Sequence, residues 1–375
     1  MIDLLKSVAH AKQCDERRNR LPTTDDAALT DKQNRNQPLR SLGSIWGLAF
    51  LLAASTPVLA SDDYAVAASI AGADGGWDFA SVDPQTNRLF VARSNGVMAV
   101  DLATQKVTDI LVEGAGVHGV LPIPGTPFAI SANGRSANAL LFDKATGKIE
   151  ATFPTGQGPD AIVVEPKTGL VVVFNGKSHD ATLIDVTSKT VVGSVALDGK
   201  PEVAAADGTG RVFVNLEDKN TVAVIDIAER KTVAAYPLNG CEAPTGLAFD
   251  AQTGALIAAC DNSVAKVIDA QSGAEIATLK IGKGPDGVLL DAARRRAFIP
   301  AADGTLSVLT LGGHGEIAVV GVVKTTAGAK TGAVDPLNGN VYLPSARLLP
   351  PEKEGARAKP APGTFVILVV APKKD

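Results

Sequence analysis

A repeat of about 42 residues, which starts near residue 64 and continues to the C-terminal region, constrains the fold more than any other feature. One unit is clear in four short runs rich in β-branched residues, 158–166, 170–174, 181–185 and 190–195. Turn-forming residues such as Asn175-Gly176 separate these runs. Four short strands per unit of this length are typical of a blade of a β-propeller.

Seven such units can be aligned on one position near the start of the first run. These aligned positions, 40 to 45 residues apart, are Asp78, His118, Asp160, Glu202, Thr245, Asp286 and Thr331. The sequence therefore predicts an all-β, seven-bladed propeller with four antiparallel strands per blade. Aromatic residues make up only 4% of the chain, so we expect a core of aliphatic side chains.

The ring of blades must close. The last unit supplies only three runs, 331–335, 340–344 and 364–370, whereas residues 64–70 precede the first unit and resemble a strand. We expect this N-terminal strand to complete the last blade, which removes an exposed sheet edge. Residues 346–363, rich in Pro, Lys and Glu, then form a long loop, and residues 61–375 form one propeller domain.

The third run of several units ends in an aspartate followed by a turn. These residues are Asp101, Asp143, Asp185, Asp226 and Asp269. An aspartate at this point accepts hydrogen bonds from nearby backbone amides, so we interpret the series as turn caps.

Residues 45–55 form a short apolar run that follows Arg40 and precedes Thr56–Ala60. This order is typical of a secretory signal, with cleavage predicted after Ala60. The alternative is a membrane anchor, but eleven residues are fewer than the ~20 that a spanning helix needs. We exclude residues 1–60 from the fold and expect a periplasmic or secreted protein. The polar stretch 1–40 is either an unusually long leader or the result of a misassigned translation start.

Several in-phase blocks resemble the YncE-like, or YVTN-repeat, bacterial propellers. They include Gly76-Trp77-Asp78, Gly116-Val117-His118-Gly119, Gly158-Pro159-Asp160, Lys200-Pro201-Glu202 and Cys241-Glu242-Ala243-Pro244-Thr245-Gly246. The resemblance covers residues 64–371 and implies the propeller fold. It implies little about activity, and the literal Tyr-Val-Thr-Asn string is absent.

The aligned positions start the innermost strands, so the phase of the repeat predicts that they line one mouth of a central channel. We expect a ligand site there, formed by the seven aligned residues together with Arg135 and His179 from loops on the same face. Carboxylate oxygens are ligands for a hard cation such as Ca²⁺. The candidate metal ligands are Asp78, Asp160, Glu202 and Asp286. The alternative is that these polar side chains only line a wet channel and cap loop amides.

Two cysteines lie within the propeller region, Cys241 and Cys260. Both fall in the fifth unit, where a hairpin about residues 250–254 brings their segments together. An oxidising compartment permits a disulfide between them; the alternative is two free thiols.

Two classes of function follow. The first is a periplasmic binding or scaffold protein for a small molecule or a protein partner, and we favour it because no catalytic motif is present. The second is a metal-dependent hydrolase, by analogy with propeller lactonases whose metal lies at the channel mouth. Residues 1–60 carry eight Lys and Arg against six Asp and Glu, so the rest is more acidic than the whole chain, whose net charge is -4. An acidic propeller argues against binding of nucleic acid. We expect a monomer with no membrane span.

Overall fold

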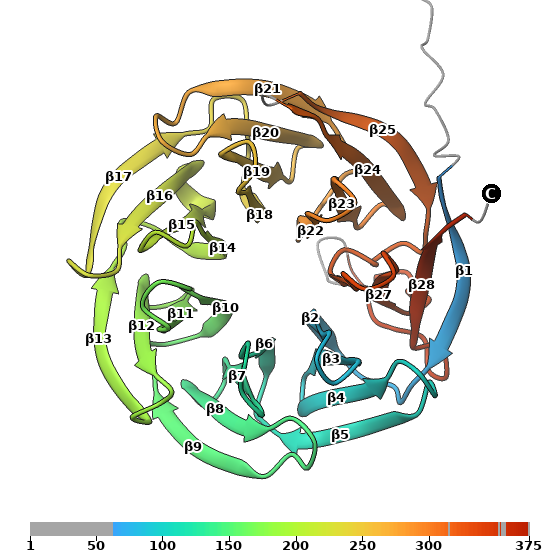
Figure 1. Ribbon diagram of the computed structural model, residues 1–375. Helices are drawn as coiled ribbons and strands as arrows, with labels where there is room; N and C mark the ends of the chain where they lie inside the picture. Colours follow the sequence, from blue (N-terminus) through green and yellow to red (C-terminus); the bar gives the residue numbers. More distant parts are fainter. Residues whose placement is uncertain (1–62, 314–315, 352, 354–357, 374–375) are drawn as a thin grey trace, which may run out of the picture. The chain divides into compact units, whose positions relative to one another are not determined.

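The computed structural model describes residues 63–313, 316–351, 353 and 358–373. Within these residues, seven four-stranded antiparallel sheets surround a central axis (Figure 1). The predicted seven-bladed propeller is therefore confirmed. The predicted signal sequence and its cleavage after Ala60 lie outside the described residues.

Each blade runs outward from its first strand. Blade 1 consists of β2 (Trp77–Asp83), β3 (Arg88–Arg93), β4 (Gly96–Asp101) and β5 (Val107–Glu113). Blade 2 consists of β6 (Val117–Pro122), β7 (Phe128–Asn133), β8 (Asn138–Asp143) and β9 (Ile149–Pro154). Blade 3 consists of β10 (Pro159–Val164), β11 (Val171–Asn175), β12 (Asp180–Asp185) and β13 (Thr190–Ala196). Blade 4 consists of β14 (Pro201–Ala206), β15 (Arg211–Leu216), β16 (Thr221–Asp226) and β17 (Lys231–Pro237). Blade 5 consists of β18 (Pro244–Asp250), β19 (Ala255–Cys260), β20 (Val264–Asp269) and β21 (Glu275–Lys280). Blade 6 consists of β22 (Leu289–Asp291), β23 (Arg296–Ala301), β24 (Thr305–Leu311) and β25 (Ile317–Lys324).

Blade 7 joins the two ends of the described chain. It consists of β26 (Ala333–Val334), β27 (Val341–Ser345), β28 (Val366–Pro372) and the N-terminal β1 (Tyr64–Ala71). Strand β1 pairs antiparallel with β28, from Tyr64 opposite Pro372 to Ala71 opposite Val366. The predicted closure is thus confirmed, and β1 covers the edge that β28 would otherwise expose (Figure 1).

The core lies between the blades. Each pair of neighbouring blades shares one cluster of buried side chains, as between β3–β5 and β6–β8, where Phe90 contributes with Val112, Val120 and Phe142. Most members of these clusters are Val, Leu, Ile or Ala, as the low aromatic content predicts. Burial of such side chains, each worth about 1.5–3 kcal/mol, holds the blades together.

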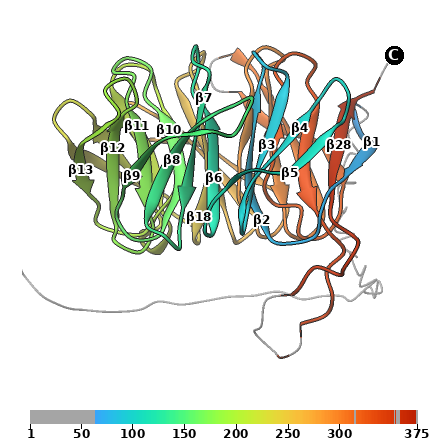
Figure 2. The ribbon, with the colours of Figure 1, turned by 90° about the horizontal axis from the view of Figure 1, so that it is seen from below.

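Figure 2 shows the propeller from the side, with its two faces at the top and bottom of the view. On the face where the inner strands end, buried acids fix adjacent blades together. Asp83 forms a buried ion pair with Lys144 of the next blade at 2.7 Å, and Asp250 accepts two hydrogen bonds from Arg295 of the next blade at 2.7 and 2.8 Å.

The third-strand aspartates cap turns, as predicted. Asp143 accepts hydrogen bonds from the amides of Ala145 and Thr146 and from the Thr146 hydroxyl. Asp101, Asp185, Asp226 and Asp269 each accept at least one such bond from their own turn. Among the described residues, no helix has the length and apolar character needed to cross a membrane.

Candidate functional site

In five of the seven blades, a β-bulge lies at the ring residue where the inner strand starts. In blade 3, Pro159 pairs with Asn175, but regular pairing resumes only at Ile162 with Val173, so Asp160 lies within the irregularity. The same break occurs at the equivalent point of β2, β6, β14 and β18. Because a bulge reorients the side chains next to it, its repetition gives the ring residues of blades 1 to 5 the same local setting around the central axis.

Three ring residues from consecutive blades converge. One ligand atom from each of Asp78, His118 and Asp160 can be chosen so that all three lie within 4.8 Å of one another. His118 Nδ1 and Asp78 Oδ2 are 2.7 Å apart and share a hydrogen bond. The imidazole is held on its other side by Gly134, where a Cβ would lie 2.6 Å from His118 Cδ2. These three side chains form a compact donor set of two carboxylates and one imidazole, which we call the channel-mouth cluster.

One acidic group of this cluster, Asp160, lies in an environment that disfavours its charged form. Burial raises the pKa of Asp160 to about 8, and the negative charges of Asp78, Glu202 and Asp286 add to the effect. The Asp160 Oδ1 atom is buried and has no hydrogen-bond partner within the described residues. The hydrogen bond to Asp78 raises the pKa of His118. A buried carboxylate oxygen without a partner is costly, so a cation or a proton at this point would stabilise the cluster.

The other two acidic ring residues face lysines. Glu202 accepts from Lys200 Nζ at 2.7 Å, and the same ammonium contacts Glu217 of the next loop. Asp286 pairs with Lys330 Nζ at 2.6 Å. Burial raises the pKa of Glu202 to about 7 and that of Asp286 in the same direction, while the lysines oppose the shift. The ring is therefore asymmetric, with lysine-neutralised acids on one side and the channel-mouth cluster on the other.

The two ring threonines connect blades. Thr331 donates a hydrogen bond to the Asp78 carbonyl at 2.9 Å, and Thr245 donates to the Pro285 carbonyl at 2.8 Å. Each bond joins one inner strand to the start of the next. These hydroxyls therefore tie neighbouring blades together near the central axis.

The two loop residues predicted for the site lie outside the channel-mouth cluster. Arg135 lines a surface pocket between blades 1 and 2. His179 is an exposed residue of the β11–β12 turn with φ +55°, and its carbonyl accepts from Leu197. Trp77 packs against Phe365 of blade 7, with ring centroids 5.5 Å apart, so it contributes to blade packing.

Lys200 is not among the residues that the sequence predicts for the site. The sequence shows that Lys200 lies two residues before Glu202. It does not show the pairing of Lys200 with Glu217, which depends on the β15–β16 turn that contains the short helix η1 (Glu217–Lys219). The sequence does carry a signal for the two lysines that pair with ring acids, because both lie close before a ring position. Lys200 lies two residues before Glu202, and Lys330 lies directly before Thr331.

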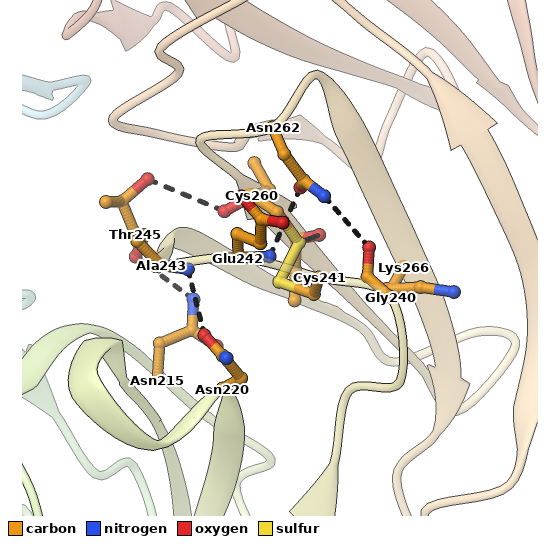
Figure 3. The surroundings of a disulfide bond; sticks show 12 residues. Asn215, Asn220, Gly240, Cys241, Glu242, Ala243, Thr245, Cys260, Asn262 and Lys266 are labelled. Atoms are coloured by element: carbon orange, nitrogen blue, oxygen red, sulfur yellow. Dashed lines mark hydrogen bonds between the residues drawn. A yellow bond between two sulfur atoms is a disulfide. The ribbon is translucent and has the colours of Figure 1, made fainter.

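The predicted disulfide is confirmed. Cys241 and Cys260 form it, with Cα atoms 5.5 Å apart (Figure 3). Cys241 lies in the loop that leads into β18 and Cys260 ends β19, so the bond fixes the loop close to Thr245. The amides of Glu242 and Ala243 donate to Asn262 and Asn220, which add further anchors to this loop.

No protein-family model matches the chain, and no curated protein matches it. Among solved structures, the chain is similar to Kuenenia stuttgartiensis hydrazine synthase, with a TM-score of 0.63 and 18% identity over 80% of this chain and 96% of that one. It is also similar to the WD40 repeats of RRP9 and to U3-55K, each with a TM-score of 0.68 and 11% identity. These matches cover 84% and 83% of this chain and 99% of each of those chains. At such identities the likeness concerns the fold alone, and it defines the chain as a β-propeller.

Proposed function

We propose that this protein is an exported binding protein of the YncE-like propeller group whose channel mouth holds a divalent metal ion. The observation that carries the proposal is the channel-mouth cluster, in which Asp78, His118 and Asp160 bring three donor atoms together and Asp160 Oδ1 lacks a partner. A metal ion would neutralise the buried acids and occupy the unsatisfied oxygen. Its remaining positions would take water or a donor atom of a bound molecule.

The donor set favours a particular kind of metal. Two carboxylates with an imidazole suit first-row ions such as Mn²⁺, Fe²⁺ or Zn²⁺, whereas Ca²⁺ prefers six to eight oxygens. Glu202 and Asp286, the other predicted metal ligands, already pair with Lys200 and Lys330. We therefore centre the site on Asp78, His118 and Asp160 rather than on four carboxylates.

Export is supported by the disulfide. A bond between Cys241 and Cys260 persists in an oxidising compartment, as expected for a periplasmic or secreted protein. The apolar run at residues 45–55, followed by Ala60, supplies the export signal.

Metal titration of the purified protein, after treatment with chelator, tests the proposal. Calorimetry with Zn²⁺, Mn²⁺ and Ca²⁺ should show one site that prefers a first-row ion. His118→Ala and Asp160→Asn should each weaken this binding by about tenfold or more, because each removes one ligand. Asp261→Asn changes an exposed acid on the same face and should bind like the wild type. Equal affinity in all variants, or no binding of any metal, would refute the site.

A metal-dependent hydrolase is the second candidate, and one observation favours it. Glu202 belongs to the same ring, and its pKa of about 7 suits a general base near neutral pH. Lactone and ester hydrolysis should then depend on the added metal and disappear in Glu202→Gln while metal affinity is retained. Tight metal binding without turnover would leave the binding function alone.

A further inference from the structure

A loop contact recurs in blades 3 to 6 and, among the described residues, is not found in blades 1, 2 and 7. Where the chain leads into each inner strand, one backbone amide donates to a side-chain oxygen of the turn between the second and third strands. The pairs are Gln157 with Ser178 at 2.8 Å, Lys200 with Asp218 at 2.7 Å, Glu242 with Asn262 at 3.2 Å and Lys283 with Asp303 at 2.8 Å. This contact, which we call the loop latch, adds a side-chain bond to the backbone bonds that join the loop and the turn. Such backbone bonds run from the Lys177 amide to the Gln157 carbonyl in blade 3 and from the Arg135 amide to the Ala115 carbonyl in blade 2, each at 3.1 Å.

In blade 2 the counterparts are Ala115 and Ser136, and in the part of the chain that is described they form no such bond. The Ser136 hydroxyl instead donates to Asn138 Oδ1 at 3.1 Å and lies near the Asn133 carbonyl at 3.4 Å. A pocket of 590 Å³ lies at this junction between blades 1 and 2. Its volume falls within the ~300–1,000 Å³ of small-molecule sites.

Two unpaired charges of opposite sign line the pocket. Glu113 ends β5, and Arg135 follows β7; both are exposed. Neither side chain forms a hydrogen bond or an ion pair with another described residue, nor do they pair with each other. The stem of Arg135 is held against Gly116, where a Cβ would lie 2.8 Å from Arg135 Cγ. A guanidinium held in this way can bind a carboxylate through two parallel hydrogen bonds.

The remaining wall carries amide groups and some apolar surface. Asn133 is fully buried and donates to Asn138 Oδ1 at 2.8 Å, which holds the amide group of Asn138 in place. Asn95 adds a second amide, and Ile110 adds an exposed aliphatic side chain. Amides both donate and accept, so they complement peptide groups.

We propose that this pocket is a second binding site, separate from the channel-mouth cluster, which takes a short peptide with both termini free. The peptide carboxylate binds Arg135, its ammonium binds Glu113, and its backbone contacts Asn95 and Asn138. A single anion would be repelled by Glu113 and a single cation by Arg135, whereas a molecule with both charges satisfies each.

Calorimetry with trialanine tests this site on the purified protein in the presence of chelator, so that the outcome does not depend on metal binding at the channel mouth. Trialanine should bind, and N-acetyl-trialanine and trialanine amide should each bind about tenfold or more weakly, because each lacks one charge. Arg135→Gln should abolish the preference for the free carboxylate. Glu113→Gln should abolish the preference for the free amine.

Lys177→Gln is the matched control. Lys177 is the blade 3 counterpart of Arg135 and packs against Gly158 in the same way, but the loop latch of that blade is intact. This variant should bind trialanine like the wild type. The proposal is overturned if trialanine does not bind, if the three peptides bind equally, or if Lys177→Gln weakens binding as much as Arg135→Gln. Binding of succinate that exceeds that of trialanine would also overturn it, since it would indicate a site for anions.

Discussion

The carboxyl group of Asp160 is unfavourable for the stability of the metal-free fold but suited to binding a metal ion. Its carboxyl is buried beside other acids, and its Oδ1 atom has no partner among the described residues. A side chain chosen for stability alone would be neutral at this position. The retained acid agrees with the proposed metal site, because unfavourable local interactions are commonly tolerated where a ligand will relieve them.

Replacement of Asp160 by Asn should stabilise the metal-free protein in a pH-dependent manner. The folded-state pKa of about 8 lies above the ordinary value of 3.8, so the folded state keeps a proton that the unfolded state loses. Wild-type stability should therefore fall as pH rises from about 4 to about 8. Relative to the wild type, the Asn variant should gain about 1 kcal/mol or more at high pH and little at low pH.

Denaturant unfolding in chelator at about pH 5, 7 and 9 measures this difference. Asp261→Asn, which alters an exposed acid of the same face, should show no comparable trend. A constant difference across the pH range would contradict the assigned burial effect.

At the scale of elements, the same bulge at the start of successive inner strands sets the site. Sequence phase identified Asp78, Asp160 and Asp286 as equivalent, but equivalence does not decide their partners. Asp78 contacts His118, whereas Asp286 contacts Lys330. These differences arise from the turns and loops of neighbouring blades, whose geometry depends on packing across the junction.

The disulfide of blade 5 should contribute stability to the whole sheet. It links residues 19 apart in the sequence and fixes the loop that leads into β18. Replacement of both Cys241 and Cys260 by Ala should lower the free energy of unfolding by about 3 kcal/mol, mainly because the unfolded chain gains freedom. Thermal unfolding measures the change. Reducing agent should lower the wild-type midpoint to a similar degree and leave the double variant unchanged; a shift in both would point to another cause.

At the scale of the molecule, β1 completes the last blade and so closes the ring of sheets. Seven inter-blade clusters form an uninterrupted circle, and the junction of blade 7 with blade 1 includes Ile367 and Leu89. Without β1, the backbone edge of β28 and side chains of Val366–Pro372 would be exposed to water and to other chains.

A chain that begins at Gly72 should therefore aggregate or unfold at a markedly lower temperature than a chain that begins at Ser61. Size-exclusion chromatography and thermal unfolding compare the two. The Ser61 chain serves as the control because it retains β1 and matches the predicted domain 61–375. Equal stability of both chains would show that the clasp between β1 and β28 is dispensable.

The sequence by itself determined the blade number, the four strands per blade, the closing strand and the turn-capping aspartates, and it placed Cys241 and Cys260 in one unit while two free thiols remained the alternative to a disulfide. All of these follow from local periodicity and from the spacing of residues along the chain. Only the tertiary structure decided which ring residues meet: Asp78 with His118 and Asp160, Glu202 with Lys200, and Arg135 in a pocket apart from them. Such contacts depend on the bulges, on the directions of side chains across blade junctions and on burial. A repeat pattern does not encode these features, because the pattern is the same in every blade whereas the contacts differ from blade to blade.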